Sequence, residues 1–386
     1  MKYSRDKKGN PVSRLAFGCM RLSGDYSKNE RAVMTAIELG VNYFDTAYIY
    51  PGNESMLGEI LARNGIRDKV SIATKLPHYL IKSVEDAEKM FNEELRRLKT
   101  DYVDYYLMHM LTDVETWQRL CDLGIDKWLR EKVENGKIRQ IGFSYHGNTE
   151  EFIRLVDANA WDFCMIQYNY LDEHSQAGRR GLEYAGGKGI PVFIMEPLRG
   201  GRLANKLPDS ARRIIGDYQI KHTPVDWALR WLWNQPYVTS VLSGMTSEDM
   251  VRENVATLND TETGSLTEGD FAMLSEVVKA VNASMKVGCT GCGYCMPCPR
   301  NVDIPGTFAA YNRKYSDGLF TALKEYAMCT ALRKNSSAAS NCIGCGKCEK
   351  HCPQGIEIRR ELKKAASELE GIPYKLVKKV ARLFRF

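Results

Sequence analysis

The stretch Val41-Asn42-Tyr43-Phe44-Asp45-Thr46-Ala47-Tyr48-Ile49-Tyr50 joins a short, β-like apolar run to a loop. Pro51-Gly52-Asn53-Glu54 follows, with the composition of a turn and then a helix start. This order predicts that Asp45 ends a strand and that Tyr50 lies in the loop after it. In parallel α/β proteins, ligands bind at that edge of the sheet. An acid and a phenol placed there form half of a proton-transfer site, although Asp-Thr taken alone is equally a helix cap.

Strands and helices alternate on both sides of this stretch. Eight strand–helix units are predicted between residues 12 and 260, which is the number and length typical of a (β/α)8 TIM barrel. A doubly wound sheet is the alternative, but it would carry Gly-x-Gly-x-x-Gly after its first strand, and the sequence has none there. We therefore expect an α/β barrel over residues 1–282, with one helix spanning about 115–134.

Polar residues stand where most of the predicted strands end. Among them, Asp45, Lys75 and His109 should surround one point, because the active sites of such barrels form at this end, and Tyr50 can fold over it. Free tyrosine titrates near pH ~10, and a neighbouring ammonium is expected to lower its pKa. The carboxylate keeps the lysine charged and the histidine orients a substrate oxygen. This set suits protonation of a carbonyl oxygen while hydride arrives at carbon.

Across residues 12–260 the chain resembles the aldo-keto reductases. The resemblance implies an NAD(P)H-dependent barrel acting on a small carbonyl or alcohol substrate, with Tyr50 as proton donor beside Asp45, Lys75 and His109. The motifs that carry it occur in the family's order: Asp45-Thr46-Ala47, Gly52-Asn53-Glu54, Leu57-Gly58, Thr74-Lys75, Leu107-Met108-His109, Ile141-Gly142-Phe143-Ser144, Ile166-Gln167-Tyr168-Asn169, Ser243-Gly244 and Glu253-Asn254.

The same resemblance implies where the nucleotide binds. Ser144 and Gln167 are expected to hold the nicotinamide amide. The remaining contacts are expected from the loop near the pyrophosphate, the end of the last strand and the adenine side: Leu198, Gly200, Gly201, Ser243, Glu253 and Asn254.

Some positions depart from the family pattern. Gly244 and Met250 stand where basic residues usually grip a 2′-phosphate, Met195 aligns with a stacking aromatic, and Tyr145 replaces an Asn. Lysine or arginine is the physical requirement for that phosphate. NAD and NADP therefore both stay open, with three arginines as candidate substitutes: Arg199, Arg202 and Arg252.

Eight of the 12 cysteines fall in two short runs, each followed by proline. The second run has the C-x₂-C-x₂-C-x₃-C-P spacing of bacterial ferredoxins, and the first has one residue fewer before its last cysteine. Zinc also suits C-x₂-C pairs, but four thiolates in one run, twice, favour two [4Fe–4S] clusters. Crossed ligation would assign Cys289, Cys292, Cys295 and Cys352 to one cluster and Cys342, Cys345, Cys348 and Cys298 to the other.

Residues 283–372 are therefore predicted to form a mostly α-helical, ferredoxin-like domain with two clusters, including one helix over Gly306–Lys334. The whole chain resembles the subgroup of aldo-keto reductases that carry such a C-terminal domain. Residues 373–386 are predicted to form a basic amphipathic helix. Such a helix either packs its apolar face on the protein or binds a membrane surface or an acidic partner.

Composition limits the class of protein. Hydrophobic residues make up 44% and charged residues 26%, as in ordinary globular proteins. The N-terminus lacks the apolar core of a signal peptide, and no apolar run is long enough to cross a membrane, so we expect a cytoplasmic protein. The net charge of +6 is spread over interleaved acids and bases, which gives no reason to expect nucleic acid.

Two functions of different classes fit these features. The first is an oxidoreductase whose clusters exchange electrons with the barrel or with an electron-transfer protein. A nicotinamide delivers hydride whereas a cluster moves one electron at a time, so a converter such as a flavin would be needed, although no flavin motif is visible. The second is a binding or regulatory barrel with structural or redox-sensing clusters.

Overall fold

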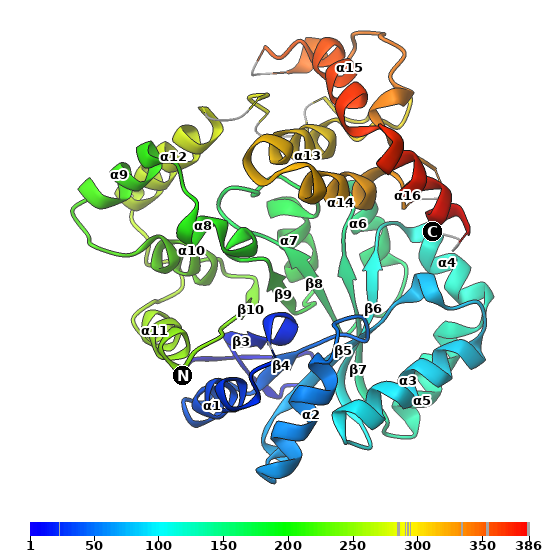
Figure 1. Ribbon diagram of the computed structural model, residues 1–386, viewed down its shortest axis with the longest axis vertical. Helices are drawn as coiled ribbons and strands as arrows, with labels where there is room; N and C mark the ends of the chain where they lie inside the picture. Colours follow the sequence, from blue (N-terminus) through cyan, green and yellow to red (C-terminus); the bar gives the residue numbers. More distant parts are fainter. Residues whose placement is uncertain are drawn as a thin grey trace.

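The computed structural model describes residues 1–22, 24–283, 286–289, 291, 293, 295–332, 335–352 and 355–383, with side chains described as far as residue 380. Eight parallel strands close into a barrel, in the order β10-β3-β4-β5-β6-β7-β8-β9 (Figure 1). The predicted TIM barrel is confirmed, and a doubly wound sheet is excluded. The strands are β3 Leu15–Gly18, β4 Tyr43–Asp45, β5 Ser71–Leu76, β6 Val103–Leu111, β7 Ile138–Tyr145, β8 Phe163–Gln167, β9 Val192–Met195 and β10 Val238–Ser243.

Helices surround the barrel. They are α1 Tyr26–Glu38, α2 Asn53–Arg63, α3 Val84–Leu98, α4 Val114–Asp122, α5 Ile125–Glu134, α6 Thr149–Asp157, α7 Gly178–Gly187, α8 Arg202–Asn205, α9 Asp209–Asp217, α10 Pro224–Trp233, α11 Glu248–Asn259 and α12 Glu268–Ala283. The single helix expected over 115–134 was wrong. Gly124 has a φ of 86°, a left-handed conformation that ends α4 and begins α5. Helix α12 was not predicted.

The interior of the barrel changes character along its axis. Alternate strand residues point inward, and in the middle of the barrel these are apolar, such as Tyr43, Leu107 and Phe163. Closer to the C-terminal ends of the strands, the inward-facing residues are Asp45, Lys75 and His109, which are all buried. At the opposite end, the hairpin of β1 (Tyr3–Arg5) and β2 (Pro11–Ser13) closes the barrel. Asp6 beside it accepts a 2.9 Å hydrogen bond from the Tyr105 hydroxyl.

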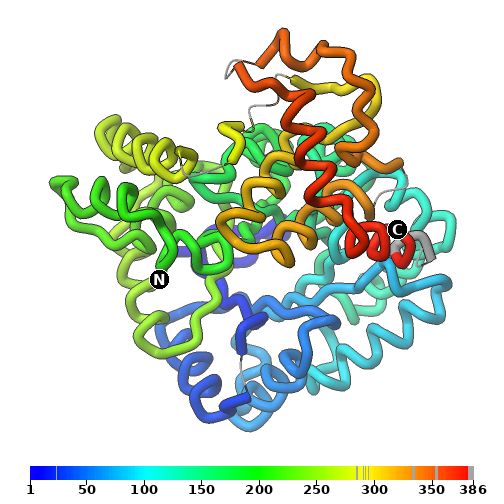
Figure 2. The backbone as a smooth tube through the Cα atoms, turned by 45° about the horizontal axis from the view of Figure 1, so that its top comes forward, coloured from blue at the N-terminus to red at the C-terminus, as the bar shows by residue number. Residues whose placement is uncertain are grey.

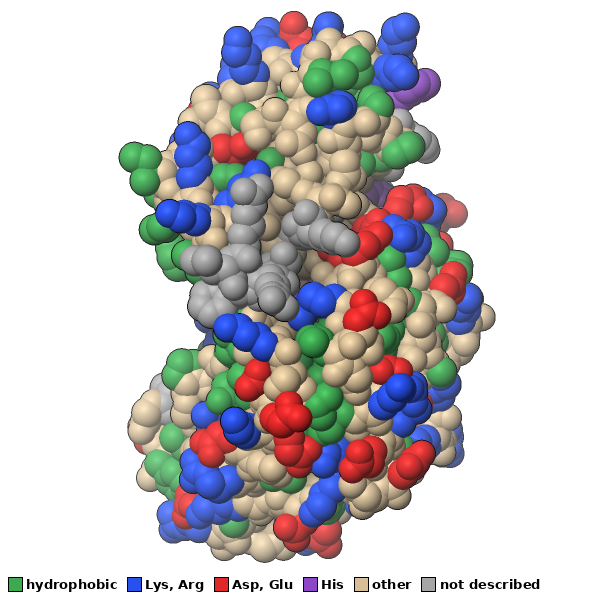
Figure 3. Space-filling view, turned by 90° about the vertical axis from the view of Figure 1, so that its right-hand side faces the viewer, with side chains coloured by type: hydrophobic (Ala, Val, Ile, Leu, Met, Phe, Trp, Pro, Cys, Tyr) green, Lys and Arg blue, Asp and Glu red, His purple; other side chains and the backbone are tan. Residues whose placement is uncertain are grey.

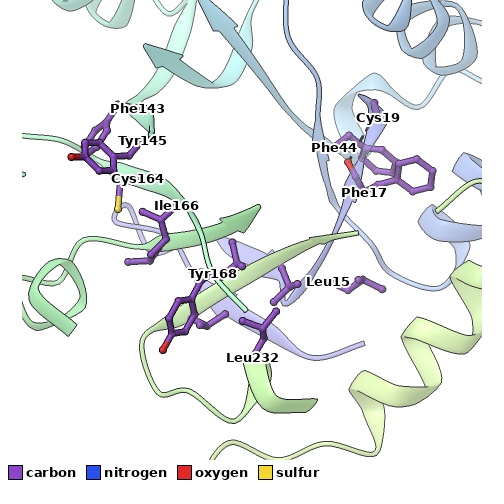
Figure 4. Packing of buried hydrophobic residues seen from close by; sticks show 14 of the residues in the cluster. Leu15, Phe17, Cys19, Phe44, Phe143, Tyr145, Cys164, Ile166, Tyr168 and Leu232 are labelled. Carbon is purple, nitrogen blue, oxygen red and sulfur yellow. Dashed lines mark hydrogen bonds between the residues drawn. The ribbon is translucent and has the colours of Figure 1, made fainter. Parts of the chain in front are cut away.

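Outward-facing strand residues pack against the helices. Figure 4 shows Phe17, Phe44 and Cys19 gathered on one side of the barrel, and Phe143, Tyr145 and Cys164 on another. Tyr145, one of the expected departures from the family pattern, is completely buried in this layer and donates to the carbonyl oxygen of Asn148 at 2.5 Å. Its side chain therefore serves packing between sheet and helices.

A second hydrophobic core lies in the C-terminal part of the chain. It gathers buried residues of α13 (Ile304–Asp317), α14 (Leu319–Thr330) and α15 (Ile358–Leu369), including Phe308, Tyr326 and Leu362. The single helix expected over 306–334 was wrong, because Gly318 with a φ of 83° separates α13 from α14. Both helices lie across one end of the barrel (Figures 1 and 2).

The last helix, α16 (Ile372–Leu383), covers most of the basic amphipathic helix predicted over residues 373–386, of which 384–386 lie outside the described residues. Tyr374 anchors it in the second core, where its ring lies 5.0 Å from that of Tyr326. Ile372 and Leu376 are nevertheless 83% and 61% exposed, so the apolar face of α16 is only partly covered by the protein. In Figure 3 the C-terminal domain forms a lobe above the barrel, and lysine, arginine and apolar side chains are mixed on the face in view. Among the described residues, no helix is both long and apolar enough to cross a membrane.

Candidate active site

Three of the four predicted catalytic side chains enter the barrel from neighbouring strands β4, β5 and β6, and the fourth comes from the loop after β4. The Lys75 Nζ atom lies 2.5 Å from Asp45 Oδ1 and 2.5 Å from the carbonyl oxygen of Thr46. It also lies 5.1 Å from the centre of the Tyr50 ring. The rings of Tyr50 and His109 are 6.1 Å apart and nearly perpendicular. The structure thus brings the four predicted residues together at the end of the barrel where β4, β5 and β6 finish.

Burial decides the protonation states at this point. Burial raises the pKa of Tyr50, and the lowering effect of the Lys75 ammonium is too small to reverse the shift. The ammonium therefore has the expected lowering effect, but burial outweighs it, the pKa of Tyr50 is raised overall, and Tyr50 is a neutral phenol. Burial also lowers the pKa of His109 well below its usual value, with Lys75 adding to the effect. A neutral imidazole carries one N–H donor, and its Nδ1 has no hydrogen-bond partner among the described residues.

The lysine stays charged despite its burial. Burial alone would lower the pKa of Lys75, but the charge of the Asp45 carboxylate and its hydrogen bond to the ammonium hold that pKa above its usual value. Burial raises the pKa of Asp45, an effect that Lys75 partly offsets. The pair is an ammonium and a carboxylate in direct contact.

The residues expected at the nicotinamide are tied to the rest of the protein by hydrogen bonds. Ser144 Oγ accepts from the backbone N–H of Met110 at 2.9 Å. The Gln167 amide is held at both ends, because Nε2 donates to Asp172 at 3.2 Å and Oε1 accepts from Gln176 at 2.7 Å. The Gln176 oxygen in turn lies 3.2 Å from His146 Nδ1.

Glu196 directly follows β9 at the same end of the barrel. Its φ of 53° is unusual for a residue with a side chain. Its carboxylate contributes to the raised pKa of Tyr50 and opposes the burial that lowers the pKa of His146. Its position after a strand end is a signal that the sequence already contained.

The predicted adenine and pyrophosphate residues are spread along the same edge. Ser243 Oγ accepts from Asn254 Nδ2 at 3.0 Å, whereas Glu253 is exposed beside it. In the predicted pyrophosphate loop, Leu198 is half-buried, and Gly200 and Gly201 have φ values of 68° and 91°. Met195 is half-buried at the end of β9, and Met250 is exposed on α11.

Two of the three arginines considered for the 2′-phosphate are engaged elsewhere. Arg199 is buried and lies 3.2 Å from Asp172. Arg202 pairs with Asp317 of the C-terminal domain. Arg252 is exposed. The sequence reasoning missed Arg21, which follows β3 and donates to the carbonyl oxygen of Gly200 at 3.0 Å.

Arg21 also lies against the other nucleotide loop, because a Cβ on Gly244 would come 3.2 Å from Arg21 Cδ. It therefore spans the two loops expected at the phosphates, and its place just after a strand end could have identified it.

The cysteine runs lie in the C-terminal domain. Cys298 lines one cavity of about 200 Å³ together with Cys342, Cys345 and Cys348, and Cys295 reaches the same cavity. Cys289 borders a cleft on the barrel side, and Cys352 packs beside the second core. Cys292 lies outside the described residues. Among the described residues, no three potential ligands are close enough to share a single metal ion.

The two runs share one backbone pattern. Gly291 and Gly293 flank the second cysteine of the first run, and Gly344 and Gly346 flank that of the second, all with φ between 71° and 77°. Alternating left-handed residues turn successive N–H groups inward, as in many Fe–S sites. The grouping of Cys298 with the second run and this shared backbone both fit iron–sulfur clusters.

Two family models match the chain. Residues 14–279 match the aldo/keto reductase family. Residues 288–357 match the 4Fe-4S dicluster domain.

Several known proteins are similar to the barrel part of this chain. An uncharacterized oxidoreductase of Bacillus subtilis, YqkF, is 26% identical over 69% of this chain and 93% of its own length. The methylglyoxal reductase YeaE of Escherichia coli is 27% identical over 66% of this chain and 86% of its own. Among solved structures, the holo form of an aldo-keto reductase from Bacillus halodurans is 26% identical with a TM-score of 0.62, over 72% of this chain and 97% of its own.

Proposed function

The chain belongs to the aldo/keto reductase family of oxidoreductases, and on that premise we propose that it reduces a small carbonyl compound, or oxidises the corresponding alcohol, with Tyr50 as the proton donor. The observation that carries the proposal is the buried Lys75–Asp45 ion pair at 2.5 Å, with the Tyr50 ring 5.1 Å from the same ammonium.

Each residue has a distinct part in this reaction. Bound NAD(P)H supplies the hydride. Tyr50, kept neutral by burial, gives its proton to the carbonyl oxygen, and Lys75 stabilises the phenolate that this leaves. Asp45 keeps Lys75 charged and in place. The neutral imidazole of His109 donates its one N–H to the substrate oxygen and orients it.

The nucleotide lies along the edge formed by the strand ends in this proposal. Ser144 and Gln167 hold the nicotinamide amide, with the Leu198–Gly201 loop and Ser243 near the pyrophosphate and Glu253 and Asn254 near the adenine. Arg21 supplies a phosphate-binding cation, supported by its position against Gly200 and Gly244. A guanidinium suits that task because it is always charged and can form two parallel hydrogen bonds to phosphate.

The C-terminal domain, residues 283–372, holds two [4Fe–4S] clusters with crossed ligation. Cys298 completes the site of Cys342, Cys345 and Cys348, which is supported by the cavity that these four line. Cys352 completes the site of Cys289, Cys292 and Cys295. Such clusters supply one-electron transfer, to the barrel or to an electron-transfer protein.

Replacing Tyr50 tests the catalytic part of the proposal. Oxidation of NADH and NADPH with a panel of carbonyl compounds is measured anaerobically for the wild type and Tyr50→Phe. Loss of a positioned acid should lower kcat by about 10²–10⁴-fold. Tyr168→Phe is the matched control, because its buried hydroxyl has no hydrogen-bond partner among the described residues. Equal rates in wild type and Tyr50→Phe would remove Tyr50 from the mechanism. Nucleotide binding without turnover would favour a binding or regulatory barrel.

The cofactor content is tested on protein purified without oxygen. Two cubanes require about eight irons per chain, four for each cluster, with matching sulfide. Flavin is measured on the same sample, because its presence would provide the step between hydride and single electrons. Four irons per chain would contradict the second cluster.

A further inference from the structure

A buried chain of polar contacts leads from the end of β8 into the C-terminal domain. Gln167 Nε2 donates to Asp172 Oδ2, and the same oxygen lies 3.2 Å from Arg199 Nε and 3.5 Å from Arg313 Nη2. Arg313, on α13, pairs through its Nε with Glu325 on α14. Barrel and C-terminal domain are therefore joined at the residue that orients Gln167.

The burial of these groups makes each depend on the others. Asp172, Arg199, Arg313 and Glu325 are at most 7% exposed. A buried charge that loses its partner is strongly unfavourable, whereas a fully paired set is tolerated. Burial would raise the pKa of Asp172, but Arg199 and Arg313 together hold it below its ordinary value. Asp172 is thus a carboxylate and accepts the Gln167 N–H, and one of the two cations responsible belongs to the other domain.

We infer that Arg313 is a positioning residue for Gln167, so that the C-terminal domain completes the nicotinamide end of the nucleotide site. The inference rests on the proposed function, which places the nicotinamide amide at Gln167.

The geometry of Gln167 explains why a distant arginine matters. Asp172 at one end of the amide and Gln176 at the other fix which atom is the donor and which the acceptor. The Gln167 amide can pair with the nicotinamide carboxamide only in that orientation. If the Gln167 amide were rotated by half a turn, its N–H group would face an N–H group of the nicotinamide. If Arg313 were removed, Glu325 would lose its cation, and the Asp172 carboxylate would keep only Arg199 of its two positive neighbours.

The arrangement also links two equilibria. If docking of the C-terminal domain orders Gln167, nucleotide binding strengthens that docking by the same factor, because coupling between two binding events is reciprocal. A barrel whose nicotinamide end is ordered by the docked domain binds the dinucleotide best when the cluster-bearing domain is in place.

The test uses the full chain with its clusters. Arg313→Gln combined with Glu325→Gln removes both charges of the buried pair and leaves neither unpaired. Lys314→Gln combined with Glu368→Gln is the matched control, because this ion pair also joins α13 to another helix of the same domain but contacts neither Asp172 nor Gln167. Dissociation constants are measured by titration for NADH, NADPH and ADP-ribose, which lacks the nicotinamide. Far-ultraviolet circular dichroism and iron content check folding.

Loss of one well-placed hydrogen bond corresponds to about tenfold in affinity. We expect the Arg313→Gln/Glu325→Gln variant to bind the dinucleotide about tenfold more weakly and ADP-ribose within about twofold of wild type. The Lys314→Gln/Glu368→Gln control should leave both affinities unchanged. An equal loss for dinucleotide and ADP-ribose, or no loss for either, overturns the inference while the proposed function stands. A wild type that binds neither dinucleotide overturns both.

Arg313→Lys provides a second variant that preserves the charge. Lysine lacks the planar fork with which arginine reaches two acceptors, so it can serve Glu325 or Asp172 but not both. We expect a smaller loss, still confined to the dinucleotide. If the double variant fails to fold, this variant decides the inference, and unchanged dinucleotide affinity overturns it.

Discussion

Replacing Lys75 with methionine tests the electrostatics of the catalytic site. The Lys75 and Asp45 side chains are 2% and 6% exposed and 2.5 Å apart. Methionine fills similar space and leaves the Asp45 carboxyl buried without a cation. Breaking a buried pair by removing one partner costs about 3–5 kcal/mol. An ion pair nearer the surface, Lys132–Glu88 at 2.8 Å, should cost only ~0–1 kcal/mol when broken by Lys132→Met, which makes that variant the matched control.

The loss in Lys75→Met should depend on pH. Burial already raises the pKa of Asp45, and without Lys75 nothing in the pair offsets this. The folded state then binds a proton that the unfolded state, with a carboxyl pKa of about 3.9, has released. The free energy of unfolding of the variant therefore falls as pH rises above ~4, until the pH passes the raised pKa of the folded state. The wild type, with its ammonium in place, should show a weaker dependence.

Urea unfolding of the barrel, followed between pH 5 and pH 8, measures both effects. The double variant Lys75→Met/Asp45→Leu should recover most of the loss, because both charges are then gone and the site is apolar. Purely additive effects of Lys75→Met and Asp45→Leu would refute the coupling between the two side chains. The coupling would also be refuted if the difference in free energy of unfolding between Lys75→Met and wild type were the same at pH 8 as at pH 5.

Three further outcomes are expected. Arg21→Gln should weaken nucleotide binding by roughly 5–10-fold, measured by titration, because a charge-assisted hydrogen bond is worth ~1.5 kcal/mol or slightly less at an exposed site. Arg130→Gln, at an exposed arginine on α5, is the control, and equal affinities of Arg21→Gln and wild type would exclude Arg21 from the site. Gly58→Ala should lower the free energy of unfolding by about 1–3 kcal/mol, since a Cβ there would lie 2.7 Å from Leu98 Cα, and an unchanged urea midpoint would contradict this. Cys298→Ser should reduce the iron content by up to about four atoms per chain, whereas Cys121→Ser, outside both runs, should not; full iron in Cys298→Ser would argue against its assignment as a ligand.

Much of the barrel could be predicted from the pattern of apolar and polar residues along the chain. Alternation of strand and helix predicts the parallel barrel, and the period of two within strands carries inward-facing positions from Tyr43 to Asp45. Because the parallel strands all end at one edge, a polar residue near the end of each of three neighbouring strands was enough to bring Asp45, Lys75 and His109 together. The spacing of the cysteines alone predicted the dicluster domain that the family model matches.

Helix boundaries were less predictable where glycine interrupts a helical pattern. Gly124 and Gly318 stand within stretches whose apolar spacing is otherwise helical. Their left-handed conformation, and the packing on either side, divides each stretch into two helices. A glycine inside such a pattern is compatible with either outcome, so only the packed chain decided between them.

The sequence by itself determined the barrel, the identity of its polar strand-end residues and the two cysteine runs, because these follow from periodicity and spacing along the chain. Only the tertiary structure decided that the pKa of Tyr50 is raised and not lowered, because desolvation depends on everything packed around the phenol. Only the tertiary structure directed Arg199 and Arg202 to carboxylates and joined Arg313 to Asp172. These partners lie far apart in the sequence or in different domains, and the pairing of charges across such distances leaves no periodic trace in the chain.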